Sequence, residues 1–317
     1  GSAAAEGSAA KRQRTEVDND VVMDVSAIGT IAALLVEPDI SLWKDTRAWD
    51  SQRFPREAQV KGREREVQHL VHFDAVEDCD TPDEGDTVCD MIWVEEWRGD
   101  EVRSRLAVRQ FRGEKRLDTF AAMPDSFFVR FQLLKCSANK DFAVLIIDVS
   151  VAFMHADIEE EIKVKVPAGI ESATGFWRLL KALNGTQKAS QSWCEHSANI
   201  VTGWDASRND YSGAVFRLED ANIDIEQHGD DFFCEGPRLE ILKLRDKFAG
   251  GFMVKKAIVI SQHADDEKEG WFLHRRVSVD EHGWHEEIDR KYIDEMVKSC
   301  GVEDGHSLST PGYKDTR

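Results

Sequence analysis

The sequence predicts an α+β fold, with an antiparallel sheet that carries helices on one face. Residues 142–147 form an uninterrupted apolar run, which is typical of a strand buried on both faces. Polar and apolar side chains alternate over residues 222–227, and a Gly/Asp turn then leads into the apolar residues 232–234. This second stretch predicts a β-hairpin.

The N-terminal part of the chain has weaker patterns. Residues 1–50 are mostly small, polar or charged, and we expect them to be largely disordered. Within them, residues 11–14 are either a nuclear-localisation patch or a basic run without function. A charged helix is expected over residues 55–71, followed by an acidic loop over residues 74–90.

The next segments predict alternating strands and helices. Two strands are expected at residues 91–94 and 103–108, joined through Arg98-Gly99-Asp100. Residues 126–136 have helical spacing, and we interpret their apolar stripe (Phe127, Phe128, Phe131 and Leu134) as core packing rather than a surface for base stacking. The later expected elements are a loop and helix over 181–193, a helix over 239–248, strands over 252–260 and 271–279, and a helix over 288–300.

Composition limits the class of protein. A chain of 317 residues with 32% charged and 41% hydrophobic residues suits a soluble globular protein with two or three sub-domains. The longest apolar candidate, residues 28–36, is too short to cross a membrane. The six cysteines are scattered without metal-ligand spacing, which indicates reduced thiols and a cytoplasmic or nuclear location.

Three aspartates stand at the ends of the predicted strands. Asp148 follows the apolar run directly, and Asp230 and Asp231 lie at the tip of the hairpin. Taken singly, Asp148 also suits a helix N-cap, and the Gly-Asp-Asp stretch also suits a solvated turn. Taken together, three carboxylates on neighbouring strand ends are what two divalent ions require for in-line phosphoryl transfer. Hard oxygen ligands favour Mg²⁺ or Mn²⁺.

Three blocks of sequence, in order, carry a family resemblance. In the first, residues 148–162 place Ala-Phe and then His after an aspartate, and residues 166–169 close the block with Val-Pro-Ala-Gly. Residues 178–185, with Ala189 and Trp193, form the second block, and Asp230-Asp231 form the last. Over residues 55–312 the chain resembles the reverse transcriptase of copia-type retrotransposons.

The resemblance implies a right-hand polymerase palm with fingers and a partial thumb. The implied division is a fingers-like region at 51–140, a palm with the catalytic aspartates at 141–250 and a palm end or thumb-like region at 251–317. The implied activity is that of the RNA-directed DNA polymerase domain of a Pol polyprotein. Such a domain adds dNTPs to a primer 3′-hydroxyl on an RNA template, with a DNA or RNA primer and two Mg²⁺ or Mn²⁺ ions.

The resemblance also assigns roles to particular residues. Asp148, the Val149 carbonyl, Asp230 and Asp231 would hold metal, and the three aspartates would be catalytic. For Asp231 the alternative is that it only orients the site, because neighbouring side chains on a strand point to opposite faces. Nucleotide-binding roles fall on Arg103, Arg105, Val149, Phe153, Gly185 and Lys188. For Arg103 and Arg105 the alternative is a solvent-exposed strand face, and for Phe153, the implied gate against a ribose 2′-hydroxyl, it is core packing.

Several features oppose an active polymerase. The net charge is −19, although the segment 98–116 is locally basic. Residues 184–190 depart from the family's Tyr-Gly-Leu-Lys-Gln-Ala-Pro. In addition, His228-Gly229 replaces the family's Tyr-Val, and Leu273-His274 replaces its Leu-Gly. The alternative function is a decayed or domesticated remnant that binds nucleic acid or protein without catalysis. The sequence leaves the oligomeric state open.

Overall fold

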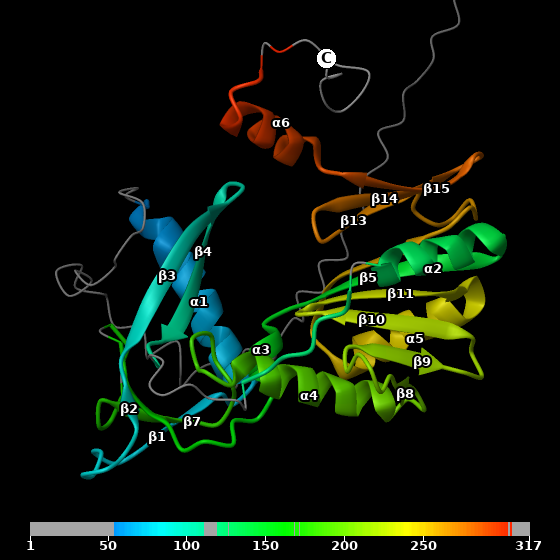
Figure 1. Cartoon of the computed structure of the whole chain (residues 1–317). Helices are drawn as coiled ribbons and strands as arrows, with labels where there is room; N and C mark the ends of the chain where they lie inside the picture. The colour runs from blue at the N-terminus through cyan, green and yellow to red at the C-terminus, as the bar shows by residue number, and fades with distance from the viewer. Residues whose placement is uncertain are drawn as a thin grey trace, which may run out of the picture.

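Figure 1 shows the computed structural model of the chain, which describes residues 54–110, 119–125, 127–167, 169–170, 172–303 and 305. The predicted disordered segment 1–50 and the basic patch at 11–14 lie outside the described residues. Within the described residues, no helix combines the length and the apolar character needed to cross a bilayer. The predicted domain boundaries at 140 and 250 remain predictions.

A six-stranded antiparallel sheet forms the centre of the molecule. Its order is β12 (Val254–Ile260), β5 (Phe142–Val149), β11 (Asp231–Pro237), β10 (Ile223–His228), β9 (Val215–Leu218) and β8 (Ser207–Arg208). The apolar run is the inner strand β5, in which the side chains of residues 142–147 are all buried. The predicted hairpin is β10 and β11, so the α+β prediction is confirmed.

Both faces of the central sheet are covered. Helices α4 (Ala189–Thr202) and α5 (Arg238–Gly251) pack on one face, where Trp193, Phe232 and Phe248 join the main core. The other face packs against α2 (Phe127–Ala138) and a three-stranded sheet of β13 (Glu269–Phe272), β14 (Arg275–Asp280) and β15 (Gly283–Ile288). Coverage on two sides explains why β5 has no polar face.

A second lobe lies beside the central sheet (Figure 1). It contains α1 (Arg56–His72), the hairpin of β3 (Met91–Arg98) and β4 (Glu101–Val108), and the short α3 (Ala152–His155). A further sheet has the order β1 (Val76–Asp78), β7 (Phe176–Leu179), β6 (Lys163–Lys165) and β2 (Val88–Cys89). Its strands of two to four residues, two of them in the predicted acidic loop, are too short to give a periodic signal.

Buried polar contacts hold α1 against the β3–β4 hairpin. The Arg63 guanidinium lies 2.6 Å from the Glu95 carboxylate, and both side chains are almost fully buried. The Leu106 amide donates to Glu66 at 3.0 Å. Because breaking a buried pair leaves an uncompensated charge, these contacts fix the helix on the hairpin.

Two local predictions are wrong. The stripe on α2 is not core packing, because Phe127, Phe131 and Leu134 are exposed while Val129 and Leu133 of the same helix are buried. Residues 271–279 do not form one strand, because the chain turns back at Leu273 and His274, which have φ values of 47° and 62°. Neither result follows from local spacing, since the neighbours that cover each side chain come from elsewhere in the chain.

Gly185 lies at the contact between the two lobes. Its φ is 87°, and a Cβ at this position would lie 2.1 Å from the Val108 carbonyl oxygen at the end of β4. Beside it, the Val108 amide donates to the Asn184 carbonyl at 2.7 Å. The close backbone approach expected at Gly185 is therefore present, but its partner is β4.

The α2 face of the central sheet contains two buried carboxylates. Glu226 and Glu235 are 2% and 0% exposed. Glu235 pairs with Lys135 of α2, whereas Glu226 Oε2 is buried without a hydrogen-bond partner among the described residues. Burial, with Asp125 nearby, raises the pKa of Glu226 to about 7. The folded protein therefore favours the protonated form of Glu226.

Replacing Gly185 with alanine should separate β4 from the central lobe. The clash with Val108 and the left-handed backbone together should lower the free energy of unfolding by on the order of 3 kcal/mol, measured by urea denaturation. Gly250 is the matched control, because it lies in α5 with no atom near an added Cβ. Gly250→Ala should leave stability unchanged or raise it slightly, and a Gly185→Ala protein as stable as wild type would contradict the packing role.

Glu226→Gln should change how stability depends on pH. The folded pKa of Glu226 is raised above its ordinary value of 4.5, so wild type loses stability as pH rises from that value through about 7. Glutamine cannot ionise, and the variant should be more stable than wild type at pH 8 by up to about 3 kcal/mol, with little difference at pH 4.

Urea unfolding followed by circular dichroism at the two pH values measures this difference. Glu281→Gln, at a side chain that is 85% exposed, is the control and should follow wild type at both values. If Glu226→Gln also followed wild type, the buried carboxyl would not titrate as the structure indicates.

Candidate active site

The register between β5 and β11 brings two of the three aspartates together. Asp148 is the cross-strand partner of Asp231. Paired residues of an antiparallel ladder point to the same face, so both carboxylates leave the sheet on one side. The alternation argument for an orienting role of Asp231 does not apply here, because Asp230 belongs to the turn and only Asp231 belongs to the strand.

The hairpin tip that carries Asp230 is held by buried contacts. Gly229 has a φ of 65°, as suits a two-residue hairpin loop that begins with glycine. Its carbonyl accepts a hydrogen bond from Trp193 Nε1 of α4 at 2.7 Å. The Asp230 carbonyl accepts one from the Val149 amide at 3.0 Å. Helix α4 and strand β5 thus fix the tip from two sides.

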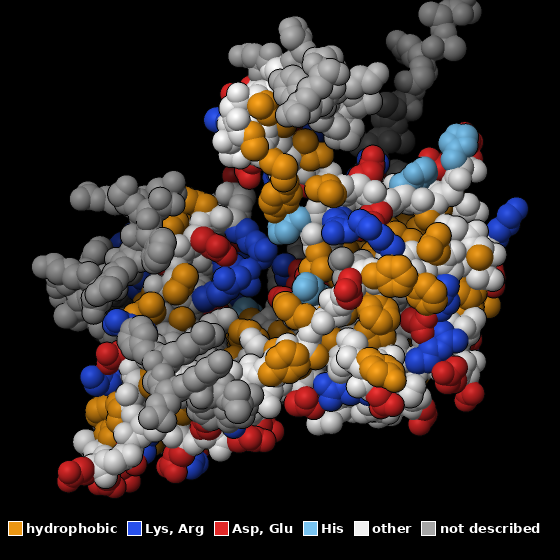
Figure 2. Space-filling view, viewed as in Figure 1, with side chains coloured by type: hydrophobic (Ala, Val, Ile, Leu, Met, Phe, Trp, Pro, Cys, Tyr) orange, Lys and Arg blue, Asp and Glu red, His pale blue; other side chains and the backbone are white. Residues whose placement is uncertain are grey.

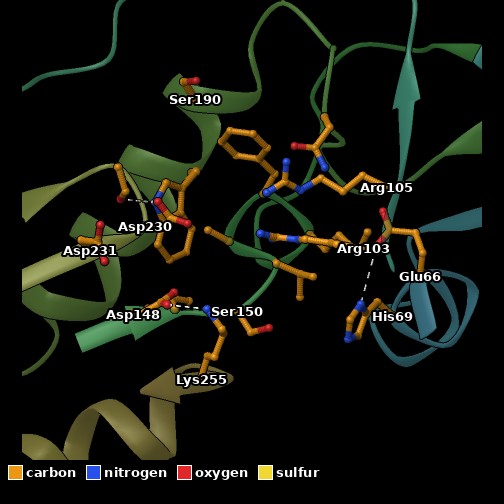
Figure 3. Close-up of a pocket in the computed structure, with 18 of the residues that line it drawn as sticks. Glu66, His69, Arg103, Arg105, Asp148, Ser150, Ser190, Asp230, Asp231 and Lys255 are labelled. Atoms are coloured by element: carbon orange, nitrogen blue, oxygen red, sulfur yellow. Dashed lines mark hydrogen bonds and ion pairs between the residues drawn. The ribbon is translucent and has the colours of Figure 1, made fainter. Parts of the chain in front are cut away.

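Asp148 does not cap a helix. The N-cap position of α3 is Val151, which has a φ of 44°, and no side chain caps this end of the helix. This result excludes the N-cap interpretation and leaves the carboxylate of Asp148 turned toward the cavity (Figure 3).

The pKa of Asp231 reflects repulsion among the acidic groups. Burial, then the charges of Asp230 and Asp148, raises its pKa to about 6, although Lys255 opposes the shift. The Lys255 amine lies 2.7 Å from an Asp148 carboxylate oxygen and comes from β12, on the other side of β5. Lysine thus supplies part of the positive charge that three neighbouring carboxylates require.

The donor atoms suit hard divalent cations, but no finished metal site is present. Within the described ranges, no group of three or more His, Cys, Asp or Glu side chains is placed to hold a metal ion. Asp148, Asp230 and Asp231 nevertheless line one cavity, and carboxylate oxygens are the ligands that Mg²⁺ and Mn²⁺ prefer. A metal would have to replace Lys255 at Asp148.

The cavity of about 810 Å³ lies between the second lobe and the central sheet. Figure 2 shows the hollow, with Lys and Arg side chains gathered on the wall beside β3 and β4. Arg103 and Arg105 are two residues apart on β4, so they share a face, and both line the cavity opposite the aspartates (Figure 3). Burial, followed by the charges of Arg105 and Arg98, lowers the pKa of Arg103. An anion between the walls would relieve this crowding of positive charge.

The remaining predicted residues divide into two groups. Val149 and Phe153 line the cavity, and Phe153 also packs against the main core, so both of its expected roles are compatible with its position. Gly185 and Lys188 do not line it. The Lys188 amine, at the start of α4, instead lies 3.8 Å from Glu159 and 3.9 Å from Glu160.

Two residues of the cavity were not foreseen from the sequence. Lys255 follows Asp148 by more than a hundred residues, and nothing in its local pattern distinguishes it from other lysines. His274 reaches the cavity from the β13–β14 turn, where its ring lies edge-on to Tyr292 at 5.4 Å. Of these two residues, only His274 had a distinguishing feature in the sequence, because a histidine in a turn that favours glycine is unusual.

Known proteins resemble this chain in sequence and, more distantly, in structure. Residues 92–311 match the family model described as reverse transcriptase (RNA-dependent DNA polymerase). The retrovirus-related Pol polyprotein from transposon TNT 1-94 of Nicotiana tabacum is 33% identical over 97 residues, which is 29% of this chain and 7% of that protein. The chain therefore aligns with a small part of that relative.

Solved structures of telomerases are also similar to this chain. A telomerase from Candida albicans, in complex with the TWJ fragment of telomeric RNA, has 9% sequence identity and a TM-score of 0.42, covering 69% of this chain and 48% of that one. An apo telomerase from Candida Tropicalis has 10% identity and a TM-score of 0.44, covering 71% and 52%. The family model spans more than half of this chain, and it is the match that decides the assignment. The chain belongs to the reverse transcriptase (RNA-dependent DNA polymerase) family, and the copia-type resemblance of its motifs is confirmed.

Proposed function

We propose that this chain is an RNA-directed DNA polymerase domain, which adds dNTPs to the 3′-hydroxyl of a DNA or RNA primer on an RNA template. The observation that carries the proposal is the placement of Asp148, Asp230 and Asp231 across one cavity from Arg103 and Arg105. Acidic groups on one wall and guanidinium groups on the other suit a reaction in which a cation and a polyphosphate meet.

Asp148, Asp230, Asp231 and the Val149 carbonyl would hold the ions, and Asp231 is included because it faces Asp148. When bound, two Mg²⁺ or Mn²⁺ ions would lower the pKa of the primer hydroxyl and neutralise charge on the phosphates. The hydrogen bonds at the hairpin tip keep Asp230 in a fixed position, which is what in-line transfer requires.

The β4 wall would receive the nucleotide. Guanidinium groups bind phosphate oxygens in a bidentate manner, so Arg103 and Arg105 suit the triphosphate. Arg105 is only loosely engaged, since its nearest carboxylate in an ion pair, that of Glu96, is 3.7 Å away. The ring of Phe153, near Asp148 and Val149, would limit space at the sugar. Gly185 and Lys188, which lie outside the cavity, are left out of this proposal.

Local charge explains how an acidic protein could accept a nucleic acid. The net charge of −19 opposes binding over the whole surface. The lysines and arginines beside the hollow (Figure 2) provide a basic wall where phosphates would lie. Binding should therefore weaken steeply as salt is added.

Two observations favour the alternative, a domesticated or decayed domain without catalysis. Lys255 already pairs with Asp148, and the described residues contain no group placed to hold a metal ion. A protein that had lost the reaction would keep the fold and the basic wall and would bind nucleic acid or protein.

Primer extension with Mg²⁺ on an RNA template separates the two functions. Wild type should extend the primer, and Asp148→Asn or Asp230→Asn should lower the rate by on the order of 10³-fold, since each removes a metal ligand. Asp246→Asn, on the outside of α5, should extend at the wild-type rate. Absence of extension by wild type would reject the polymerase proposal, and salt-dependent binding of an RNA–DNA hybrid without extension would favour the alternative.

Lys255→Met should strengthen the binding of divalent ions. The lysine ammonium competes for the Asp148 carboxylate, so its removal should tighten Mn²⁺ binding by roughly tenfold, measured by electron paramagnetic resonance. The measurement is made at pH 8, above the pKa of about 6 for Asp231. Lys247→Met, at an exposed position on α5, is the control. Unchanged or weaker Mn²⁺ binding by Lys255→Met would show that Lys255 does not occupy the metal position.

A further inference from the structure

A second cavity, of about 340 Å³, lies on the α2 face of the central sheet, away from the aspartates. Its floor is formed by side chains from β8, β9 and β10, toward the β8 edge of the sheet, and its wall by α2. Helix α2 contacts β5, β10 and β11. Figure 2 shows hydrophobic side chains gathered over this part of the molecule, with charged groups beside them.

Two buried acceptors in this cavity lack a donor. Glu226 is 2% exposed, and its Oε2 has no hydrogen-bond partner among the described residues. Gln132 is also 2% exposed, and its Oε1 is likewise unpaired. The orientation of this amide is set by its Nε2, which donates to the Asp224 carbonyl at 3.2 Å. Unpaired buried acceptors cost free energy, so a donor from outside the protein would stabilise both groups.

The cations nearby are already engaged. Arg217, which lines the cavity, donates to Asp224 at 2.9 Å and to Glu219 at 3.3 Å. Lys135 of α2 pairs with Asp224 and Glu235. Neither cation contacts Glu226, whose pKa is raised by burial and by Asp125. Glu226 thus has no cation to compensate its ionised form, and a cation from outside the protein would favour that form.

Part of the remaining lining is apolar, and Ser207 and Asn209 complete it. Phe128 and Phe131 of α2 and Val215 of β9 surround the polar groups. Phe131 is 44% exposed and stacks on the exposed Phe127 at 6.4 Å, so aromatic surface remains open beside the cavity. The volume is at the lower end of the range for small-molecule sites. An apolar wall beside an unpaired carboxylate suits a flat apolar body that ends in a cationic donor group.

We infer that this cavity binds a small organic cation, in which an amidinium or guanidinium group donates to Glu226 and Gln132 while its apolar body packs on Phe128 and Phe131. The amidinium carries several N–H donors in one plane, so a single group serves both acceptors. The inference is independent of the proposed polymerase activity, because it uses none of the residues of that site.

Benzamidine is the probe, and the measurement is a TROSY NMR titration that also shows where it binds. Shifts should gather at β8, β9, β10 and α2, with a Kd on the order of 1 mM. Benzamide, which has the same shape without the charge, should bind at least tenfold more weakly. Glu226→Gln should weaken benzamidine binding at least tenfold, and Phe131→Ala should weaken it about threefold. Glu281→Gln should not change it.

Three results would overturn the inference. The first is no shift at the cavity up to 10 mM benzamidine, and the second is equal binding by wild type and Glu226→Gln. The third is a set of shifts confined to Gly229, Asp230 and Asp231, which would mean that the cation is drawn only to the acidic end of the sheet. Phe131→Ala guards against a folding artefact, because it alters an exposed side chain that the core does not need.

Discussion

The pairing register between β5 and β11 is the constraint on which the site depends. It sets Asp231 opposite Asp148 and continues through Phe232, Phe233 and Cys234 against a fully buried strand. A slip of one residue would turn every one of these side chains to the other face. Because apolar packing on both faces of β5 forbids that slip, the core of the protein determines the geometry of its acidic end.

The hairpin tip and the lobe contact extend this control to the rest of the cavity. Trp193, which is 1% exposed, ties the hairpin tip to α4, and the start of α4 follows the loop in which Gly185 meets β4. The wall with Arg103 and Arg105 is therefore linked to the wall with the aspartates through a short, tightly packed path. A cavity made from two lobes keeps its dimensions only if such a path is rigid.

Charge in this protein is arranged locally rather than in total. Acidic groups gather at one end of the central sheet, where Lys255 offsets them, and arginines face them from β4. Away from this end, Glu235 is compensated by Lys135 while Glu226 is not. The same physical rule, that a buried carboxylate needs a cation or a proton, thus gives different outcomes at two places on one sheet.

The sequence by itself determined the inner strand, the hairpin, the three aspartates at strand ends and the reverse transcriptase motifs. These features are set by short runs, because alternation, apolar runs and turn residues act over a few neighbours. Only the tertiary structure decided that Asp231 faces Asp148, that Gly185 meets β4, that Lys188 lies outside the cavity and that the aromatic stripe of α2 is exposed. Each of these features depends on contacts between segments far apart in the chain. The pair of Lys255 and Asp148, at a separation of 107 residues, is another such contact, and local sequence patterns carry no information about it.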